Sequence, residues 1–167
     1  MSDDNTFIRR VYLDVLGKLP TPEVVNSFVA DKTSDKRSKV IEDLLNRPEF
    51  VKMWVMKWAE LLQIRTDNNR FQYKNAILYF EWLRAQFEQN RPMNQIVQDL
   101  LGSKGGTFSN PAGNYYQLER DSKKLMENTA QIFMGMRIQC AQCHNHPFDR
   151  WTMDDYYSFA NFFSQVG

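Results

Sequence analysis

The sequence predicts an all-α fold, a compact bundle of roughly eight helices, and three features of the chain support this. Apolar side chains recur three or four positions apart in successive segments, which is the spacing of one face of an α-helix. No stretch shows a convincing alternation of apolar and polar residues, the pattern typical of a half-buried strand. Proline, glycine and small capping residues divide the periodic segments at short intervals, where helices begin and end.

Four helices are expected in the first part of the chain. Gly17 is placed to end the first, because glycine readily adopts the left-handed conformation that closes a helix. Thr21 can cap the second, with Pro22 at its first position, where a missing N–H has no cost. Ser34 or Asp35 can cap the third, and Pro48 ends it and opens the fourth. The expected ranges are about 7–16, 22–30, 35–46 and 49–64.

The rest of the chain predicts four more helices and one long irregular loop. Residues 66–69 are polar and predict a loop, after which helices are expected over about 71–89 and 92–101. Residues 102–114 hold four of the seven glycines and predict a surface loop. A long helix is expected from about Ser122 through Met136 to the cysteines. Thr152 is well placed to cap the last helix, over about 153–163.

All of the cysteine and histidine in the protein lies between positions 140 and 146. Cys140, Cys143 and His144 form a C-x-x-C-H pattern, which is the signature for covalent attachment of a c-type haem. Two thiols one helical turn apart can form thioethers with the two vinyl groups of the porphyrin. The adjacent imidazole then supplies the proximal bond to iron. The sequence therefore predicts one covalent haem c, with the helical bundle built around it.

Two other kinds of site can be built from the same residues. Two thiolates and two imidazoles make a complete Cys₂His₂ set for zinc, but structural zinc usually draws its ligands from two separated pieces of chain. Here all four donors fall within seven residues. A thioredoxin-like redox pair would need a βαβ context, which the sequence does not show. Plain burial of the four side chains is the remaining reading.

The haem interpretation assigns further residues to the site. His146 lies two positions after His144, so we expect it to bond a propionate, a backbone carbonyl or solvent, or to stay structural. Nearby donors are either partners of the haem propionates or a solvated arginine and packed aromatics; these are Arg137, Arg150, Trp151 and Tyr157.

The sixth iron ligand is left open by the sequence. Methionine is a common choice, and Met53 or Met56 is favoured because both lie on a separate helix. Lys57 is a less usual alternative. Met134 and Met136 are expected to precede the cysteines on the same helix, which places them poorly for the opposite haem face. Met126 and Met153 complete the candidates.

The bulk composition narrows the class of protein. With 167 residues the chain is expected to form a single domain, residues 1–167. Its net charge of +1 gives no argument for a nucleic-acid partner, and no apolar run is long enough to span a membrane. The polar N-terminus lacks the features of a signal peptide. Because haem attachment takes place outside the cytoplasm, we expect the domain to be excised from a longer exported protein, periplasmic or otherwise extracytoplasmic.

The chain resembles the planctomycete-type cytochrome c domain family, a group of domains of unknown function. The resemblance is carried by residues 128–151 around the C-A-Q-C-H motif, by 7–23 at the start and by 154–160 near the end. It implies an exported haem-bearing domain, usually followed by further domains, but it supplies no reaction. Relatives often carry a histidine in the helix where this chain has 54–58, which leaves the sixth ligand open here.

The expected function is electron transfer between the haem and a redox partner protein or the C-terminal domains of the same full-length chain. A haem enzyme with an open distal face, such as a peroxidase or oxidoreductase, is the alternative. It would need a distal base, and His146 is the only spare histidine. A zinc-stabilised interaction domain is the third possibility.

Overall fold

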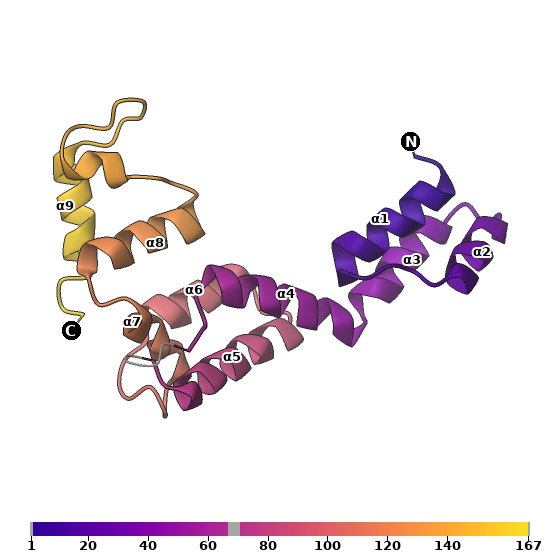
Figure 1. Ribbon diagram of the computed structural model, residues 1–167, viewed down its shortest axis with the longest axis horizontal. Helices are drawn as coiled ribbons and strands as arrows, with labels where there is room; N and C mark the ends of the chain where they lie inside the picture. The colour runs from indigo at the N-terminus through magenta and orange to yellow at the C-terminus, as the bar shows by residue number, and fades with distance from the viewer. Residues whose placement is uncertain (1, 67–70, 167) are drawn as a thin grey trace. The chain divides into compact units, whose positions relative to one another are not determined.

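The computed structural model describes residues 2–66 and 71–166, and within them it is all-helical, as the sequence predicts. The described part of the chain contains nine α-helices, two short 3₁₀ helices and no β-strand (Figure 1). Residues 67–69 of the predicted polar loop lie outside the described residues. The chain divides into two compact units, Met1–Lys57 and Trp58–Gly167, and each is described by itself. No helix in the described ranges has the length and apolarity needed to cross a lipid bilayer.

The first unit is formed by three helices and the start of a fourth. These are α1 (Asp4–Leu16), α2 (Pro22–Ala30), α3 (Lys36–Leu45) and the beginning of α4 (Pro48–Leu61). α1 packs against α2 and α3, and the core of the unit consists of Ile8, Tyr12, Leu16, Phe28 and Leu44.

The boundaries of these helices follow the predicted start and stop residues. Gly17 ends α1 in the left-handed conformation, with φ 67°, and its N–H donates to the carbonyl of Leu13. Pro22 opens α2 behind Thr21. The cap residues predicted from the sequence are therefore correct for these two helices.

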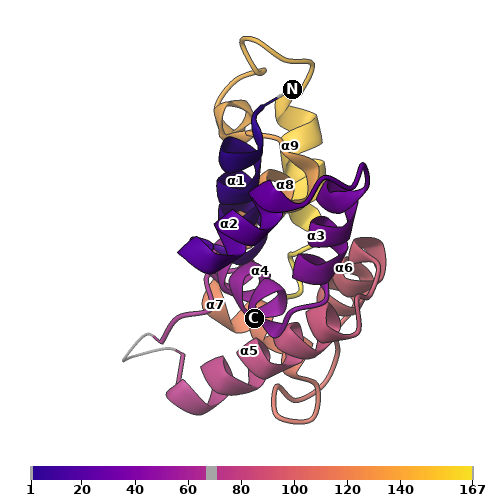
Figure 2. The same cartoon turned by 90° about the vertical axis from the view of Figure 1, so that its right-hand side faces the viewer.

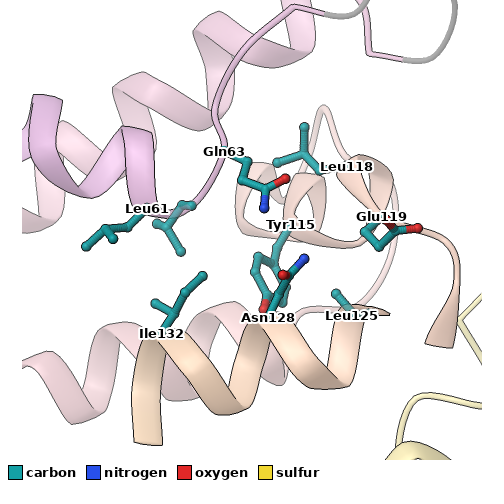
Figure 3. A pocket seen from close by; sticks show the side chains of 9 residues that line it. Leu61, Gln63, Tyr115, Leu118, Glu119, Leu125, Asn128 and Ile132 are labelled. Atoms are coloured by element: carbon teal, nitrogen blue, oxygen red, sulfur yellow. The ribbon is translucent and has the colours of Figure 1, made fainter. Parts of the chain in front are cut away.

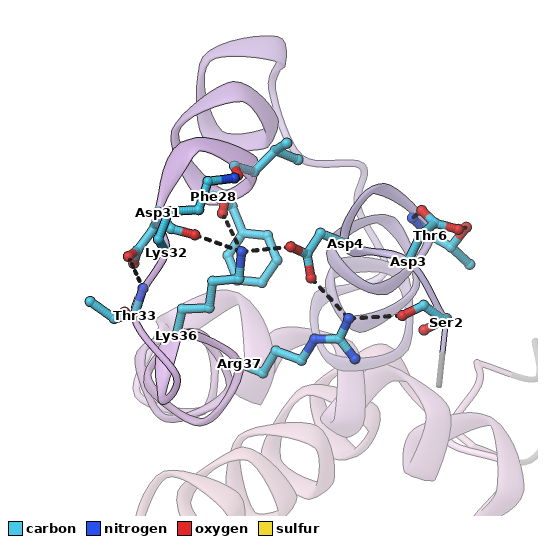
Figure 4. Close-up of polar contacts among 11 residues, drawn as sticks. Ser2, Asp3, Asp4, Thr6, Phe28, Asp31, Lys32, Thr33, Lys36 and Arg37 are labelled. Carbon is cyan, nitrogen blue, oxygen red and sulfur yellow. Dashed lines mark hydrogen bonds and ion pairs between the residues drawn. The ribbon is translucent and has the colours of Figure 1, made fainter.

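A polar network joins α1 to α3 at the edge of this core (Figure 4). The Lys36 ammonium donates to Asp4 Oδ2 at 2.6 Å and to the carbonyls of Phe28 and Asp31, and the Arg37 guanidinium donates to Asp4 Oδ1 at 2.8 Å. The hydrogen bonds from Lys36 and then Arg37 lower the pKa of Asp4. This carboxylate therefore fixes α1 on α3.

The second unit holds the remaining helices. They are the end of α4, α5 (Tyr73–Glu88), α6 (Met93–Leu101), η1 (Pro111–Asn114), α7 (Tyr115–Leu118), α8 (Ser122–Met134), η2 (Gln139–Gln142) and α9 (Met153–Asn161). α8 lies against α9, and the loop that joins them extends past both helices (Figures 1 and 2). This pair of helices positions the cysteine segment.

The prediction of an irregular loop over 102–114 is wrong at its end. Residues 111–114 form η1, and α7 follows directly. Asn114 is fully buried and holds this segment in a regular conformation. Its amide N–H groups donate to the carbonyls of Thr107 and Pro111, and its amide oxygen accepts a 2.8 Å hydrogen bond from Asn75 of α5. A buried amide with all of these partners folds the segment onto α5.

The prediction of a helix continuing from Ser122 to the cysteines is also wrong. α8 ends at Met134, because Gly135 adopts φ 64° and its N–H donates to the carbonyl of Ala130. The Met136 N–H donates to the same carbonyl at 3.1 Å. Residues 135–138 are not helical, so Met136 and Cys140 do not share a helix.

Candidate functional site

The C-x-x-C-H residues begin in η2, the short 3₁₀ helix that packs against α9. Ile138 and Ala141 are buried and anchor this turn to the unit. Cys140 and Cys143 are exposed free thiols. The apolar residues thus hold the turn in place while both sulfur atoms stay accessible to a reagent or cofactor.

The hydrogen bonds of the two histidines place the proton on a different nitrogen of each neutral ring. Nδ1 of His144 lies 2.7 Å from the carbonyl oxygen of Asn145. A carbonyl can only accept, so Nδ1 of the neutral ring carries the proton and Nε2 presents a lone pair. This is the arrangement in which a metal-binding imidazole is usually held.

His146 has the opposite arrangement. Its Nδ1 accepts the N–H of Phe148 at 3.2 Å, so in the neutral ring the proton is on Nε2. The backbone N–H of His146 donates to the carbonyl of Trp151 at 2.7 Å. The ring therefore helps to form the turn that follows the motif, and its Nδ1 lone pair is already used.

The turn from 146 to 152 is closed by Asp149. Its carboxylate accepts the N–H of Arg150 at 2.7 Å and the indole N–H of Trp151 at 3.1 Å. The guanidinium of Arg150 lies over the Trp151 ring, 4.8 Å from its centre. Trp151, an expected propionate partner, thus already donates its indole N–H within the turn.

Thr152 caps α9, as the sequence predicts. Its hydroxyl accepts the N–H of Asp155, and the Asp155 carboxylate accepts the N–H of Thr152 in return. This capping box lowers the pKa of Asp155, because both the backbone N–H and the hydroxyl of Thr152 donate to the carboxylate. Asn145 adds a further link by accepting the N–H of Met153 at 3.1 Å. The motif is thereby tied to the start of α9.

A cavity of about 300 Å³ lies between the end of α8, the residues leading to η2, and α9. This volume is in the range of small-molecule and cofactor sites. Its walls are largely apolar and aromatic, which suits a flat apolar cofactor. The lining residues are Met134, Met136, Ile138, Trp151, Asp155, Tyr156, Ser158, Phe159 and Phe162.

Two adjacent tyrosines of α9 make different contacts. Tyr156 is buried and its hydroxyl donates to Glu127 Oε1 of α8 at 2.6 Å. Burial and this carboxylate raise the pKa of Tyr156 well above its ordinary value. Tyr157 is exposed, and its hydroxyl donates to the carbonyl of Gln142 at 3.1 Å. Tyr156 joins the two helices that flank the cavity, whereas Tyr157 joins α9 to the cysteine segment.

The structure brings only some of the sequence-predicted residues together. Trp151 lines the cavity, Tyr157 contacts the cysteine segment, and Arg137 is exposed just before η2. Met53 and Met56 belong to the other unit. The Met53 sulfur lies 3.1 Å from the position a side chain on Gly17 would take, so Met53 packs against the end of α1.

The cavity residues from α9 are not among the sequence-predicted site residues, whereas Met134 and Met136 are among the candidate sixth ligands. The sequence places Met134 and Met136 on a helix leading to the cysteines, whereas Met136 lies after the end of α8. Gly135 is the one sequence feature that could have revealed the turn, because a glycine at the end of a periodic segment is a typical helix stop.

A second cavity in this unit is too small for a cofactor. It has a volume of about 10 Å³, room for about one water molecule. Figure 3 shows Tyr115, Asn128 and Ile132 among the side chains around it. Tyr115 is buried and bonded to the Thr129 hydroxyl at 2.7 Å, and burial raises its pKa to about 12.

The residues that the structure describes contain no group of three or more His, Cys, Asp or Glu side chains arranged to hold a metal ion.

The fold and site define an all-helical protein with an exposed C-x-x-C-H segment beside an apolar cavity. The chain belongs to the PSCyt2 family, described as a protein of unknown function (DUF1549), whose family model matches residues 1–167. This is a planctomycete-type domain, and the match supports that part of the resemblance seen in the sequence. No curated protein and no solved structure matches the chain.

Proposed function

We propose that this chain is a c-type cytochrome domain that binds one haem covalently through Cys140 and Cys143, with His144 as the proximal iron ligand. It would pass single electrons to or from a redox partner protein, or further domains of a longer chain, in the periplasm or another extracytoplasmic compartment. The proposal rests first on the hydrogen bond that leaves Nε2 of His144 as a lone-pair donor next to two exposed thiols.

The residues around the motif fit a haem. The thiols are accessible, and a largely apolar cavity of about 300 Å³ is lined by Ile138, two residues before Cys140, and by Trp151, after the motif. Each thiol can add across one vinyl group: sulfur bonds to one carbon, the thiol hydrogen goes to the other, and no oxidant is consumed. When bound, the iron supplies a site that gains and loses one electron.

The same geometry gives less support to zinc. His146 already accepts a backbone N–H at Nδ1, so in its neutral ring the other nitrogen carries the proton. A Cys₂His₂ site would require all four side chains to converge from seven consecutive positions. Haem attachment needs only two thiols and one imidazole, and the segment contains all three.

The test is to produce the chain behind an export signal in cells that mature c-type cytochromes, and then to extract it with acid and acetone. We expect the Soret band to stay with the protein and sharp α and β bands to follow reduction. Replacing Cys140 and Cys143 together by serine should abolish retention of colour. Replacing His146 by asparagine, the matched control, should leave attachment intact. A colourless chain, or colour that the solvent removes, would refute the proposal.

A further inference from the structure

We propose that a groove on the first unit binds an amphipathic helix of a partner protein, one that carries basic residues along one side of an apolar stripe. The groove lies between α2 and α3, and all of its lining residues belong to Met1–Lys57. None of the C-x-x-C-H residues lines it. The inference therefore goes beyond the proposed function and does not depend on haem attachment.

The groove follows from the way three helices pack. α2 and α3 both pack against α1. α1 forms the floor, and the other two helices form the walls of a space of about 500 Å³. A helix laid in this space would contact both walls and complete a four-helix arrangement.

The floor of the groove is apolar and belongs to the core of the unit. Ile8 and Tyr12 of α1 and Phe28 of α2 are buried, and Val24 and Val40 on the two walls are half-buried. The apolar residues of an amphipathic helix, spaced at i, i+3, i+4 and i+7, dock into such a groove. The apolar area removed from water would supply most of the affinity.

The wall formed by α2 is acidic. Glu23, Ser27 and Asp31 line the groove at intervals of four residues, so they lie along one side of the helix. Neither carboxylate forms an ion pair with a residue that the structure describes. The adjacent cation Lys32 donates to the carbonyl of Val29 and does not line the groove.

Both of these carboxyl groups are ionised at neutral pH. The backbone N–H of Glu23 itself lowers the pKa of that side chain. The pKa of Asp31 is lowered because its Oδ1 accepts the N–H of Thr33 at 2.8 Å. The α2 wall therefore presents two negative charges to a bound partner.

The cations on the α3 side are already paired. Each of the three that line the groove has a carboxylate partner, and the pairs are Lys36–Asp4 at 2.6 Å, Lys39–Asp35 at 2.9 Å and Arg47–Asp43 at 2.6 Å. Lys36 also donates to the carbonyls of Phe28 and Asp31, which uses all three of its N–H groups (Figure 4). Basic residues facing α2 would thus complement the groove, whereas acidic residues there would be repelled.

The test uses the whole 167-residue chain and a labelled synthetic helix of leucine and lysine. The peptide is about 14 residues, or four turns, long, with its leucines at i, i+3, i+4 and i+7. Fluorescence anisotropy gives the Kd. The same peptide with glutamate in place of every lysine should bind at least about tenfold more weakly.

Two charge variants locate the contact. Glu23→Gln combined with Asp31→Asn keeps the hydrogen-bond acceptors and removes both charges, and it should weaken binding of the lysine peptide about tenfold. Asp14→Asn combined with Glu42→Gln is the matched control, because it removes two carboxylates of the same unit that do not line the groove. The control should leave the Kd unchanged.

Two bulk variants test the groove itself. Ser27 is exposed on the α2 wall, so Ser27→Tyr narrows the groove without touching the core and should weaken binding by more than about tenfold. Asn26→Tyr adds the same side chain one residue away, outside the lining, and should bind like the wild type. Circular dichroism of each variant verifies that the helices are retained.

Four results would overturn the proposal. They are no binding of the lysine peptide, equal binding of the glutamate peptide, wild-type affinity in Ser27→Tyr, and equal losses in the two double variants. Sedimentation of the wild type without peptide tests for another occupant. A dimer that Ser27→Tyr converts to a monomer would show that a second copy of the chain fills the groove, and the proposal of a basic partner helix would be wrong.

Discussion

The hydrogen bond between Tyr156 and Glu127 should contribute to the free energy of unfolding, because it joins α9 to α8. Tyr156 is buried, and its hydroxyl donates to the Glu127 carboxylate at 2.6 Å. A hydrogen bond to a charged group contributes about 1.5–3 kcal/mol, and phenylalanine at this position would leave the carboxylate without its donor. We therefore expect Tyr156→Phe to lower the free energy of unfolding by about 1.5–3 kcal/mol.

The neighbouring tyrosine provides the control for this experiment. Tyr157 is exposed, and its hydroxyl donates to an uncharged carbonyl at 3.1 Å. Tyr157→Phe should therefore cost only about 0.5 kcal/mol. Urea denaturation followed by circular dichroism measures both variants. A double-mutant cycle with Glu127→Gln isolates the pair. Equal and small losses for the two tyrosine variants, or no coupling in the cycle, would refute this account of the α8–α9 contact.

Three further predictions concern pH and the glycines that end α1 and α8. Burial holds the pKa of Tyr115 at about 12 in the folded chain, against an ordinary value of 10.0, so the unfolded chain releases this proton first. The contribution of Tyr115 to the free energy of unfolding is then fully present below pH 10 and should fall as the pH rises from 10 to 12, by up to about 1.4 kcal/mol per pH unit. Tyr115→Phe should make this decline less steep. An unchanged slope would contradict the raised pKa of Tyr115. Gly135→Ala should cost about 1–2 kcal/mol in urea denaturation, from the left-handed backbone alone, since a Cβ there meets open space. Gly17→Ala should cost more, because its Cβ would also lie 3.1 Å from the Met53 sulfur; the reverse order would show that this contact is easily relieved.

Helix boundaries could be predicted wherever one residue carries the physical cause. Gly17 ends α1, Pro22 opens α2 and Thr152 caps α9, because each acts through its own backbone or side chain on the adjacent turn. These effects are local and can be read from sequence. Gly135 acts in the same way, and overlooking it extended the predicted helix too far.

Features that depend on packing between distant segments could not be predicted. Residues 111–114 are held in a 3₁₀ helix by the hydrogen bonds of Asn114 to Asn75 and Thr107. No neighbouring residue in the sequence indicates these contacts. The cavity likewise arises only when α8 lies against α9, so Phe159 could not be recognised as part of its wall. The C-x-x-C-H pattern can be read from the sequence, whereas the hydrogen-bond partners of the two histidines could not be predicted from it.

The central claim is that a haem is bonded to Cys140 and Cys143, and peptide mass spectrometry tests it most directly. Trypsin cuts after Arg137 and Arg150, so residues 138–150 are released as one peptide. From protein exported by cells that mature c-type cytochromes, we predict that this peptide carries the mass of one haem in addition to its own residues. A peptide of unmodified mass, with both thiols free to react with an alkylating reagent, would contradict the account.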